Sequence, residues 1–200
     1  MPNIEEQTTT VIKNIPSADQ VEAELNRVKS RKGFSRAVRN TIFVLIIVAA
    51  VAVLVTVMLL PVLRIYGTSM TPTLNEGDIV LSVKGGSFKT GDVIAFYYNN
   101  KILVKRVIAN SGDWVDIDDR GNVSVNGIKI DEPYISEKSL DECDIILPYQ
   151  VPESRVFVMG DHRSTSVDSR SKAIGCISEE QIVGKILFRV WPLKGFGIVK

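Results

Sequence analysis

The strongest constraint in this sequence is a run of 23 residues, Thr41 to Leu63, that contains no charged side chain and consists mostly of Val, Leu, Ile and Ala. As an α-helix, such a run is roughly 34 Å long at about 1.5 Å per residue, which is enough to cross the hydrocarbon core of a bilayer. The alternative is an unusually long buried helix of a soluble protein. The length and composition favour a transmembrane anchor at residues 41–63.

The charges beside this run predict its orientation. The positive-inside rule places residues 1–40 in the cytoplasm and residues 64–200 outside. The run is too long for the apolar region of a signal peptide and ends without a small-x-small site, so we expect it to remain as a single-pass anchor in the cytoplasmic membrane. Five basic residues and no acidic residue lie between residues 29 and 39, namely Lys29, Arg31, Lys32, Arg36 and Arg39.

The segment before the run divides into two parts. Residues 1–16 are polar and rich in Thr, and we expect them to be unstructured. Ser17 and Gln20 have the spacing of a capping box, and apolar residues then recur at helical spacing, which predicts an amphipathic helix over residues 18–31.

After the run the pattern changes to short apolar stretches separated by turn residues, which is typical of β-strands. Residues 123–130 form the clearest hairpin signal, because Asn126-Gly127 suits a type I′ turn. The fold class is therefore mostly β, an antiparallel domain over residues 64–200 behind one N-terminal transmembrane helix. The other predicted strands are Asp78–Val83, Val93–Tyr98, Ile102–Ile108, Trp114–Ile117, Val156–Met159 and Ile182–Val190.

Composition excludes several functions. The chain has 24 basic and 23 acidic residues, so there is no electrostatic case for nucleic-acid binding. We predict no metal and no cofactor, because Cys143 and Cys176 lack the spacing of a metal site and no Gly-rich phosphate loop is present. Outside the cytoplasm a disulfide between these cysteines is possible, but the sequence favours plain buried thiols.

Two adjacent cations lie in the predicted strand 102–108. Alternation puts Lys105 on one face with Leu103 and Val107, and Arg106 on the other face. One of these two cations must point to the apolar side, where burial disfavours an ammonium and lowers the pKa of a lysine. Such a lysine can act as a general base, whereas arginine cannot lose its proton. The alternative is a pair of solvated cations on an edge strand.

Two further segments carry reactive groups. Ser69 lies in a Gly- and Pro-containing turn, and its hydroxyl needs a neighbouring base to act as a nucleophile. His162 is the only histidine, so a Ser–His–Asp triad would have to use it, with Asp161 or Asp168 as its partner. A structural alternative exists as well, in which the charged residues of segment 160–170 form a short-range ion-pair network.

Taken together, four ordered segments between about residue 64 and residue 192 resemble bacterial type I signal peptidase, the Ser–Lys leader peptidase family. Ser69-Met70-x-Pro72-Thr73-Leu74 is similar to the nucleophile segment, and Gly91-Asp92-Val93-Ile94 to the following strand. Lys105-Arg106-Val107-Ile108-Ala109 with Gly112-Asp113 is similar to the lysine segment. Gly160-Asp161-His162-Arg163-x-x-Ser166-x-Asp168-Ser169-Arg170 is similar to the last segment.

The resemblance implies a serine endopeptidase that removes signal peptides from exported preproteins at the outer face of the cytoplasmic membrane. Ser69 would be the nucleophile and Lys105 the base; Ser166 would orient the Lys105 amine, and Asp168 and Arg170 would brace the site. The bilayer and preproteins with small residues at P1 and P3 would be its partners. The residues implied to line the substrate pockets are Ile65, Tyr66, Met70, Leu74, Leu103 and Val104.

Two positions depart from the family pattern. Gly67 stands where some members have a serine that helps to bind the oxyanion, which leaves the second oxyanion donor open. His162 stands where Asn is common, and we expect this change to leave activity in place. Two other functions remain as alternatives: a self-cleaving Ser–Lys protease of the LexA type, and an inactive membrane-anchored β domain that binds exported segments. The first lacks a scissile Ala-Gly or Cys-Gly site between Leu63 and Ser69.

Overall fold

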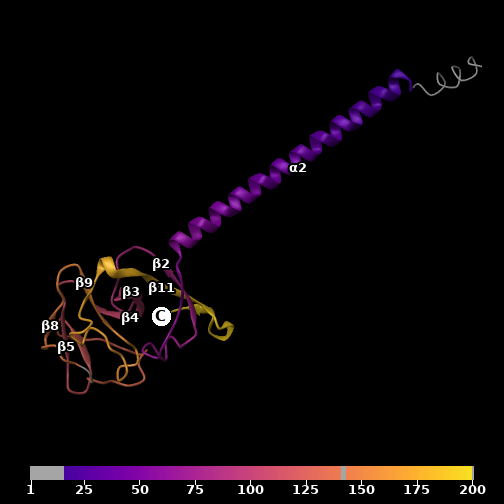
Figure 1. Ribbon diagram of the computed structural model, residues 1–200. Coiled ribbons are helices and arrows are strands. Elements are labelled where there is room, and N and C mark those ends of the chain that lie inside the picture. Colours follow the sequence, from indigo (N-terminus) through magenta and orange to yellow (C-terminus); the bar gives the residue numbers. More distant parts are fainter. Residues whose placement is uncertain (1–15, 141–142, 200) are drawn as a thin grey trace, which may run out of the picture. The chain divides into compact units, whose positions relative to one another are not determined.

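The computed structural model of the chain describes residues 16–140 and 143–199 (Figure 1). It divides into two compact units, Met1–Leu54 and Val55–Lys200, which are treated separately below. The polar segment predicted to be unstructured lies, except for residue 16, outside the described residues.

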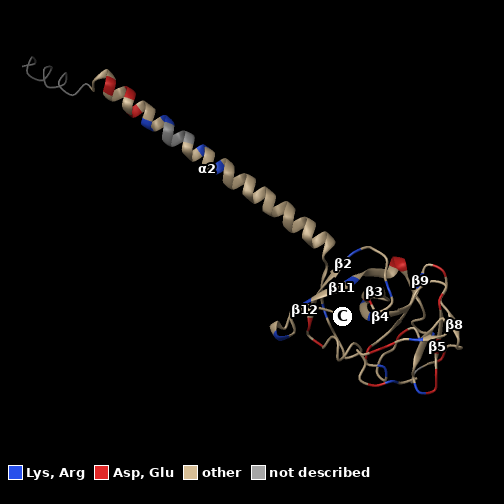
Figure 2. Cartoon of the chain, turned by 180° about the vertical axis from the view of Figure 1, so that it is seen from behind, with Lys and Arg blue, Asp and Glu red and all other residues tan. Residues whose placement is uncertain are grey.

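One continuous helix, α2 (Ala18–Leu59), replaces the two helical segments that the sequence predicts. The capping box is confirmed, because the Ser17 N–H donates to Gln20 Oε1 at 3.1 Å and the Gln20 N–H donates to Ser17 Oγ at 3.3 Å. Figure 2 shows that the charged residues of α2 lie in its N-terminal half and that the remainder is uncharged. In the part of the chain that the structure describes, α2 is the one helix long and apolar enough to cross a membrane.

The helix ends four residues before the apolar run does. Pro61 lacks a backbone N–H and restricts the residue before it, which disfavours helix at this point. Val62 and Leu63 instead belong to strand β1 (Val62–Arg64), where they lie opposite Leu81 and Val80.

An eight-stranded antiparallel sheet is the main element of the second unit, with strand order β1-β2-β11-β3-β4-β9-β10 and β12 paired to β11. Each longer strand matches a predicted one to within one residue at either end. The strands after β1 are β2 (Ile79–Val83), β3 (Val93–Tyr98), β4 (Lys101–Ala109), β9 (Arg155–Met159), β10 (Ile177–Ser178), β11 (Ile182–Trp191) and β12 (Gly197–Ile198), with 3-10 turns at η1 (Glu179–Gln181) and η2 (Leu193–Gly195).

A second, four-stranded sheet has the order β7-β6-β5-β8 and packs around an apolar cluster to which β4 and β9 of the large sheet also contribute. The predicted hairpin is confirmed, with Asn126 and Gly127 both at positive φ (53° and 79°) between β6 and β7. Its strands are β5 (Trp114–Ile117), β6 (Val123–Val125), β7 (Ile128–Lys129) and β8 (Tyr149–Gln150).

Two strand edges in the large sheet are left open. Strand β4 pairs with β3 along Lys101–Arg106, but its other neighbour, β9, begins to pair only at Arg106. Strand β1 pairs with β2 alone among the described strands. The edges of β1 and of the first half of β4 therefore keep unpaired backbone donors and acceptors, which an added strand can use.

Candidate active site

Ser69 lies in a tight turn that follows β1. Gly67 begins the turn at φ +79°, and a Cβ at that position would meet nothing within 4 Å, so its missing side chain leaves open space. The Thr71 N–H donates to the Thr68 carbonyl at 3.0 Å and the Leu74 N–H donates to the Met70 carbonyl at 2.8 Å. These bonds hold the half-buried Ser69 in a fixed backbone conformation.

The two adjacent cations of strand β4 are buried: Lys105 is 4% exposed and Arg106 is 1% exposed. The alternative of two solvated edge cations is therefore wrong. Arg106 is compensated, because its Nε and Nη2 donate to the two Asp161 oxygens at 2.8 and 2.6 Å and its Nη1 donates to the Gly91 carbonyl at 2.8 Å. Its guanidinium also lies 3.9 Å from the centre of the Tyr134 ring.

Lys105 is buried without such compensation. Among the described residues, no carboxylate forms an ion pair with Lys105 of the kind that Asp161 forms with Arg106. Loss of hydration on burial lowers the pKa of Lys105 from 10.5 to about 8, an effect that the charge of Asp168 partly opposes. A large fraction of this amine is consequently neutral near pH 8, which is the form that can accept a proton.

The segment after β9 meets the nucleophile turn at Gly160. A Cβ on Gly160 would overlap both the Ser166 hydroxyl and the Ser69 carbonyl oxygen, so only glycine fits where these two serines approach each other. The His162 N–H donates to the Ser69 carbonyl at 3.1 Å. Ser166 Oγ is the one buried side-chain polar atom without a hydrogen-bond partner among the described residues. A buried hydroxyl in that state is ready to bond a group that moves or binds next to it.

Asp168 and Arg170 form a buried pair that shapes this segment. Arg170 Nε donates to Asp168 Oδ1 at 2.8 Å, and the other Asp168 oxygen accepts the Gly160 N–H at 2.9 Å. Arg170 Nη2 also donates to the carbonyls of Arg163 at 2.8 Å and Ser166 at 3.1 Å. The pair thus fixes the backbone on both sides of Ser166.

The other two charged residues of the segment do not belong to a local network. Asp161 pairs with Arg106 of β4 and accepts a hydrogen bond from Thr73 Oγ1 at 2.5 Å, while Arg163 pairs with Glu132. Sequence reasoning missed these long-range partners. The hydrogen bond from Thr73 to Asp161 is one of the contacts that join the nucleophile turn to the segment after β9.

Within the described residues, the imidazole of His162 does not contact the groups that a histidine triad requires, which are the serine hydroxyl and an aspartate. Its Nδ1 lies 3.1 Å from Thr71 Oγ1 and its Nε2 lies 3.6 Å from Glu137 Oε1. The two aspartates that such a triad could use, Asp161 and Asp168, are both paired with arginines. The geometry therefore disfavours His162 as the base for Ser69.

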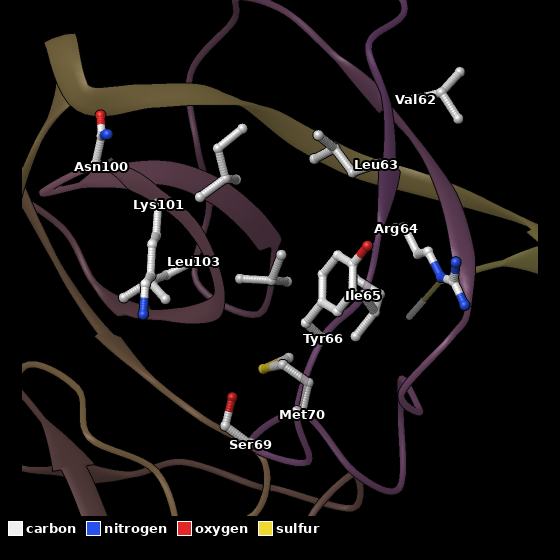
Figure 3. Close-up of a pocket in the computed structure, with 13 residues that line it drawn as sticks. Val62, Leu63, Arg64, Ile65, Tyr66, Ser69, Met70, Asn100, Lys101 and Leu103 are labelled. Atoms are coloured by element: carbon white, nitrogen blue, oxygen red, sulfur yellow. The ribbon is translucent and has the colours of Figure 1, made fainter.

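A cavity of about 780 Å³ lies between β1 and the start of β4 (Figure 3). Figure 3 shows Ser69 and Met70 together at one end of it. Leu74, one of the predicted pocket residues, is fully buried in the core beside Ile65 and Met70 and does not line the cavity. The predicted pocket residues that do line it are Ile65, Tyr66, Met70, Leu103 and Val104.

Both cysteines are free thiols, Cys143 half-buried and Cys176 buried. Burial raises the pKa of the Cys176 thiol to about 11, which keeps it protonated and unreactive at neutral pH. Over residues 16–140 and 143–199 no group of three or more His, Cys, Asp or Glu side chains is arranged to hold a metal ion.

The chain is similar to several known peptidases. The family model described as "Signal peptidase, peptidase S26" matches residues 38–191. Signal peptidase IB of Staphylococcus aureus is 40% identical over 152 residues, covering 66% of this chain and 78% of that protein. Signal peptidase I of Bacillus licheniformis is 34% identical over 171 residues, covering 77% of this chain and 91% of that protein.

Two other matches are less complete. Thylakoidal processing peptidase 1 of Arabidopsis thaliana is 36% identical over 142 residues, which are 62% of this chain and 40% of that protein. A crystal structure of a signal peptidase I from Enterococcus faecalis matches with a TM-score of 0.41 at 26% identity, covering 50% of this chain and 97% of that chain.

Proposed function

Since the chain belongs to the signal peptidase family, peptidase S26, we propose that it removes signal peptides from exported preproteins with Ser69 as nucleophile and Lys105 as general base. The observation that carries the assignment of the base is the contrast between the two neighbouring cations. Arg106 is held by a carboxylate, whereas Lys105 is desolvated and its pKa is lowered to about 8. A paired cation supports structure, while a destabilised ammonium is suited to proton transfer.

The proposed reaction has two stages. Ser69 Oγ attacks the scissile carbonyl carbon while its proton passes to neutral Lys105; the resulting ammonium then protonates the leaving amine, and an acyl-enzyme remains. In the second stage, Lys105 takes a proton from water as the water attacks the ester, and returns it to Ser69. We propose that the Ser166 hydroxyl, which is buried and has no hydrogen-bond partner among the described residues, bonds to the Lys105 amine during the reaction and orients it. The Ser69 N–H supplies one oxyanion donor, and Gly67 supplies no side-chain donor.

The two open strand edges give the substrate its path. In chain direction, strands β1 and β4 both run toward the end of the cavity where Ser69 lies. A peptide whose residues before the scissile bond lie along the cavity is therefore parallel to both strands. Its backbone can form hydrogen bonds with either open edge. Apolar side chains of β1 and β4 line the cavity that ends at Ser69, which suits apolar residues at P1 and P3, and we propose that these are small.

A preprotein with Ala at P1 is expected to be cut at least about 100-fold faster, in kcat/KM, than the same preprotein with Phe at P1, because Ile65 and Met70, which line the cavity beside Ser69, are almost fully buried and cannot move aside for a large side chain without strain. Cleavage by the purified full chain in detergent, followed by N-terminal sequencing of the product, measures this. Equal cleavage of both preproteins, or a cut away from the signal peptide boundary, would contradict the proposal.

For the chain as a whole we propose a cytoplasmic segment over residues 1–40, an anchor within residues 41–63 and an extracytoplasmic catalytic domain over residues 64–200. The basic residues before the apolar part of α2 support this orientation. Ser69 follows the end of α2 by ten residues, at most roughly 34 Å of extended chain, which keeps it within reach of a membrane-embedded signal peptide. Protease accessibility from the outside of spheroplasts is the measurement that tests this orientation.

A further inference from the structure

The single histidine of the chain touches the nucleophile turn from two directions. Its backbone N–H donates to the Ser69 carbonyl at 3.1 Å, and its Nδ1 lies 3.1 Å from Thr71 Oγ1, two residues after the nucleophile. The other ring nitrogen, Nε2, lies 3.6 Å from Oε1 of Glu137, a residue of the segment that follows β7. His162 thus links the turn that carries Ser69 to a separate part of the domain.

The hydrogen bonds define which atom donates to which. Thr71 has one hydroxyl hydrogen, and this hydroxyl donates to the Thr68 carbonyl at 2.8 Å. Toward His162 the Thr71 oxygen can then only accept, so Nδ1 must carry a proton. On the other side, the Glu137 carboxylate faces Nε2, and the Ser164 hydroxyl donates to the same carboxylate.

We propose that Glu137, His162 and Thr71 form a chain of contacts that positions the nucleophile turn for attack. Thr71 Oγ1 holds the Thr68 carbonyl, His162 Nδ1–H holds Thr71 Oγ1, and Glu137 with Ser164 fixes the rotation of the ring. The Thr68–Ser69 peptide unit carries both the N–H proposed as an oxyanion donor and the start of the nucleophilic residue. A loose turn would therefore misplace the nucleophile and the donor together. His162 acts here as a positioning residue and takes no proton from Ser69.

This inference rests on the proposed role of Ser69, and its test separates the two. For the full chain in detergent, His162→Ala and Thr71→Val are each expected to lower kcat for preprotein cleavage by about tenfold, with KM changed by less than about twofold. The double variant should also lose about tenfold in kcat, because both substitutions remove the same contact, that between His162 and Thr71. His162→Asn and Thr71→Ser, which keep a donor and an acceptor, should stay within about threefold of the parent. The matched control is Thr165→Val, a change of the same kind at an exposed position of the same segment.

A spectroscopic measurement covers the case in which a substitution affects folding. Because the chain contains one histidine, ¹⁵N-histidine labelling gives the nitrogen signals of this imidazole alone. The parent protein should show a proton on Nδ1, and Thr71→Val should change that signal. Three results would overturn the inference: an unprotonated Nδ1 in the parent, a change in KM with kcat unchanged in the single variants, or losses of activity that add in the double variant. If Ser69→Ala retains full activity, the proposed function fails instead, whatever His162 does.

Discussion

Replacing Ser69 by Ala or Lys105 by Met is expected to lower kcat for preprotein cleavage by about ten-thousand-fold or more. Alanine removes the hydroxyl that forms the acyl-enzyme. Methionine keeps much of the apolar stem of Lys105 but removes the amine that accepts the proton, and the neighbouring buried cation, Arg106, cannot lose its proton. Cleavage of a purified preprotein, measured in single-turnover conditions, tests both variants.

Folding must be excluded as the cause of such losses. Lys105→Met removes a buried ammonium that is not ion-paired, so the variant should be at least as stable as the parent. Lys105→Arg is the matched variant that keeps the positive charge and cannot lose it, and it should be as inactive as Lys105→Met. Activity in Lys105→Arg within tenfold of the parent would rule out the amine as the base.

The second large effect concerns stability rather than catalysis. Removing one partner of the Arg106–Asp161 pair, by Arg106→Met or Asp161→Asn, is expected to lower the free energy of unfolding by about 3 to 5 kcal/mol. Both side chains are almost completely buried, so the remaining partner would be left as an uncompensated charge. Urea unfolding of the full chain in detergent, followed by the fluorescence of Trp114 and Trp191, measures the change.

A half-exposed ion pair in the same sheet provides the control. Lys185 Nζ lies 2.5 Å from Asp92 Oδ1, but the lysine side chain is 36% exposed. Lys185→Met is therefore expected to change the free energy of unfolding by less than about 1 kcal/mol. If Lys185→Met and Arg106→Met destabilise equally, burial of the Arg106–Asp161 pair does not determine its contribution.

Much of this fold could be predicted from the sequence, because the longer strands are apolar runs rich in β-branched residues with turn residues between them, and the Asn126-Gly127 turn has a distinct backbone requirement. Four strands have two residues each, and three of them, β8, β10 and β12, were not predicted because two residues are too few to show a pattern; β7 was found through its turn. The single long helix was missed as well. The charged and polar residues between the amphipathic segment 18–31 and the apolar run 41–63 interrupt the apolar pattern, but they do not interrupt the backbone hydrogen bonds of the helix.

The candidate site was less predictable. Alternation correctly separates the side chains of Lys105 and Arg106 onto opposite faces of β4, yet it does not reveal that both faces are buried. Which cation is compensated depends on Asp161, which lies 55 residues further along the chain. Local patterns carry no information on such a contact. The same holds for the link from His162 to Glu137, which lies on a segment with no regular structure.

The most direct test of the account is the dependence of kcat/KM on pH, measured for the parent and for His162→Ala. Lys105 must be neutral to act, and burial lowers its pKa to about 8. Below that value kcat/KM should fall about tenfold per pH unit as the amine becomes protonated, and above it kcat/KM should level off. The account predicts the same rising limb near pH 8 in both proteins, with lower values for His162→Ala. A limb that disappears in His162→Ala would make the histidine the base and contradict the assignment of Lys105.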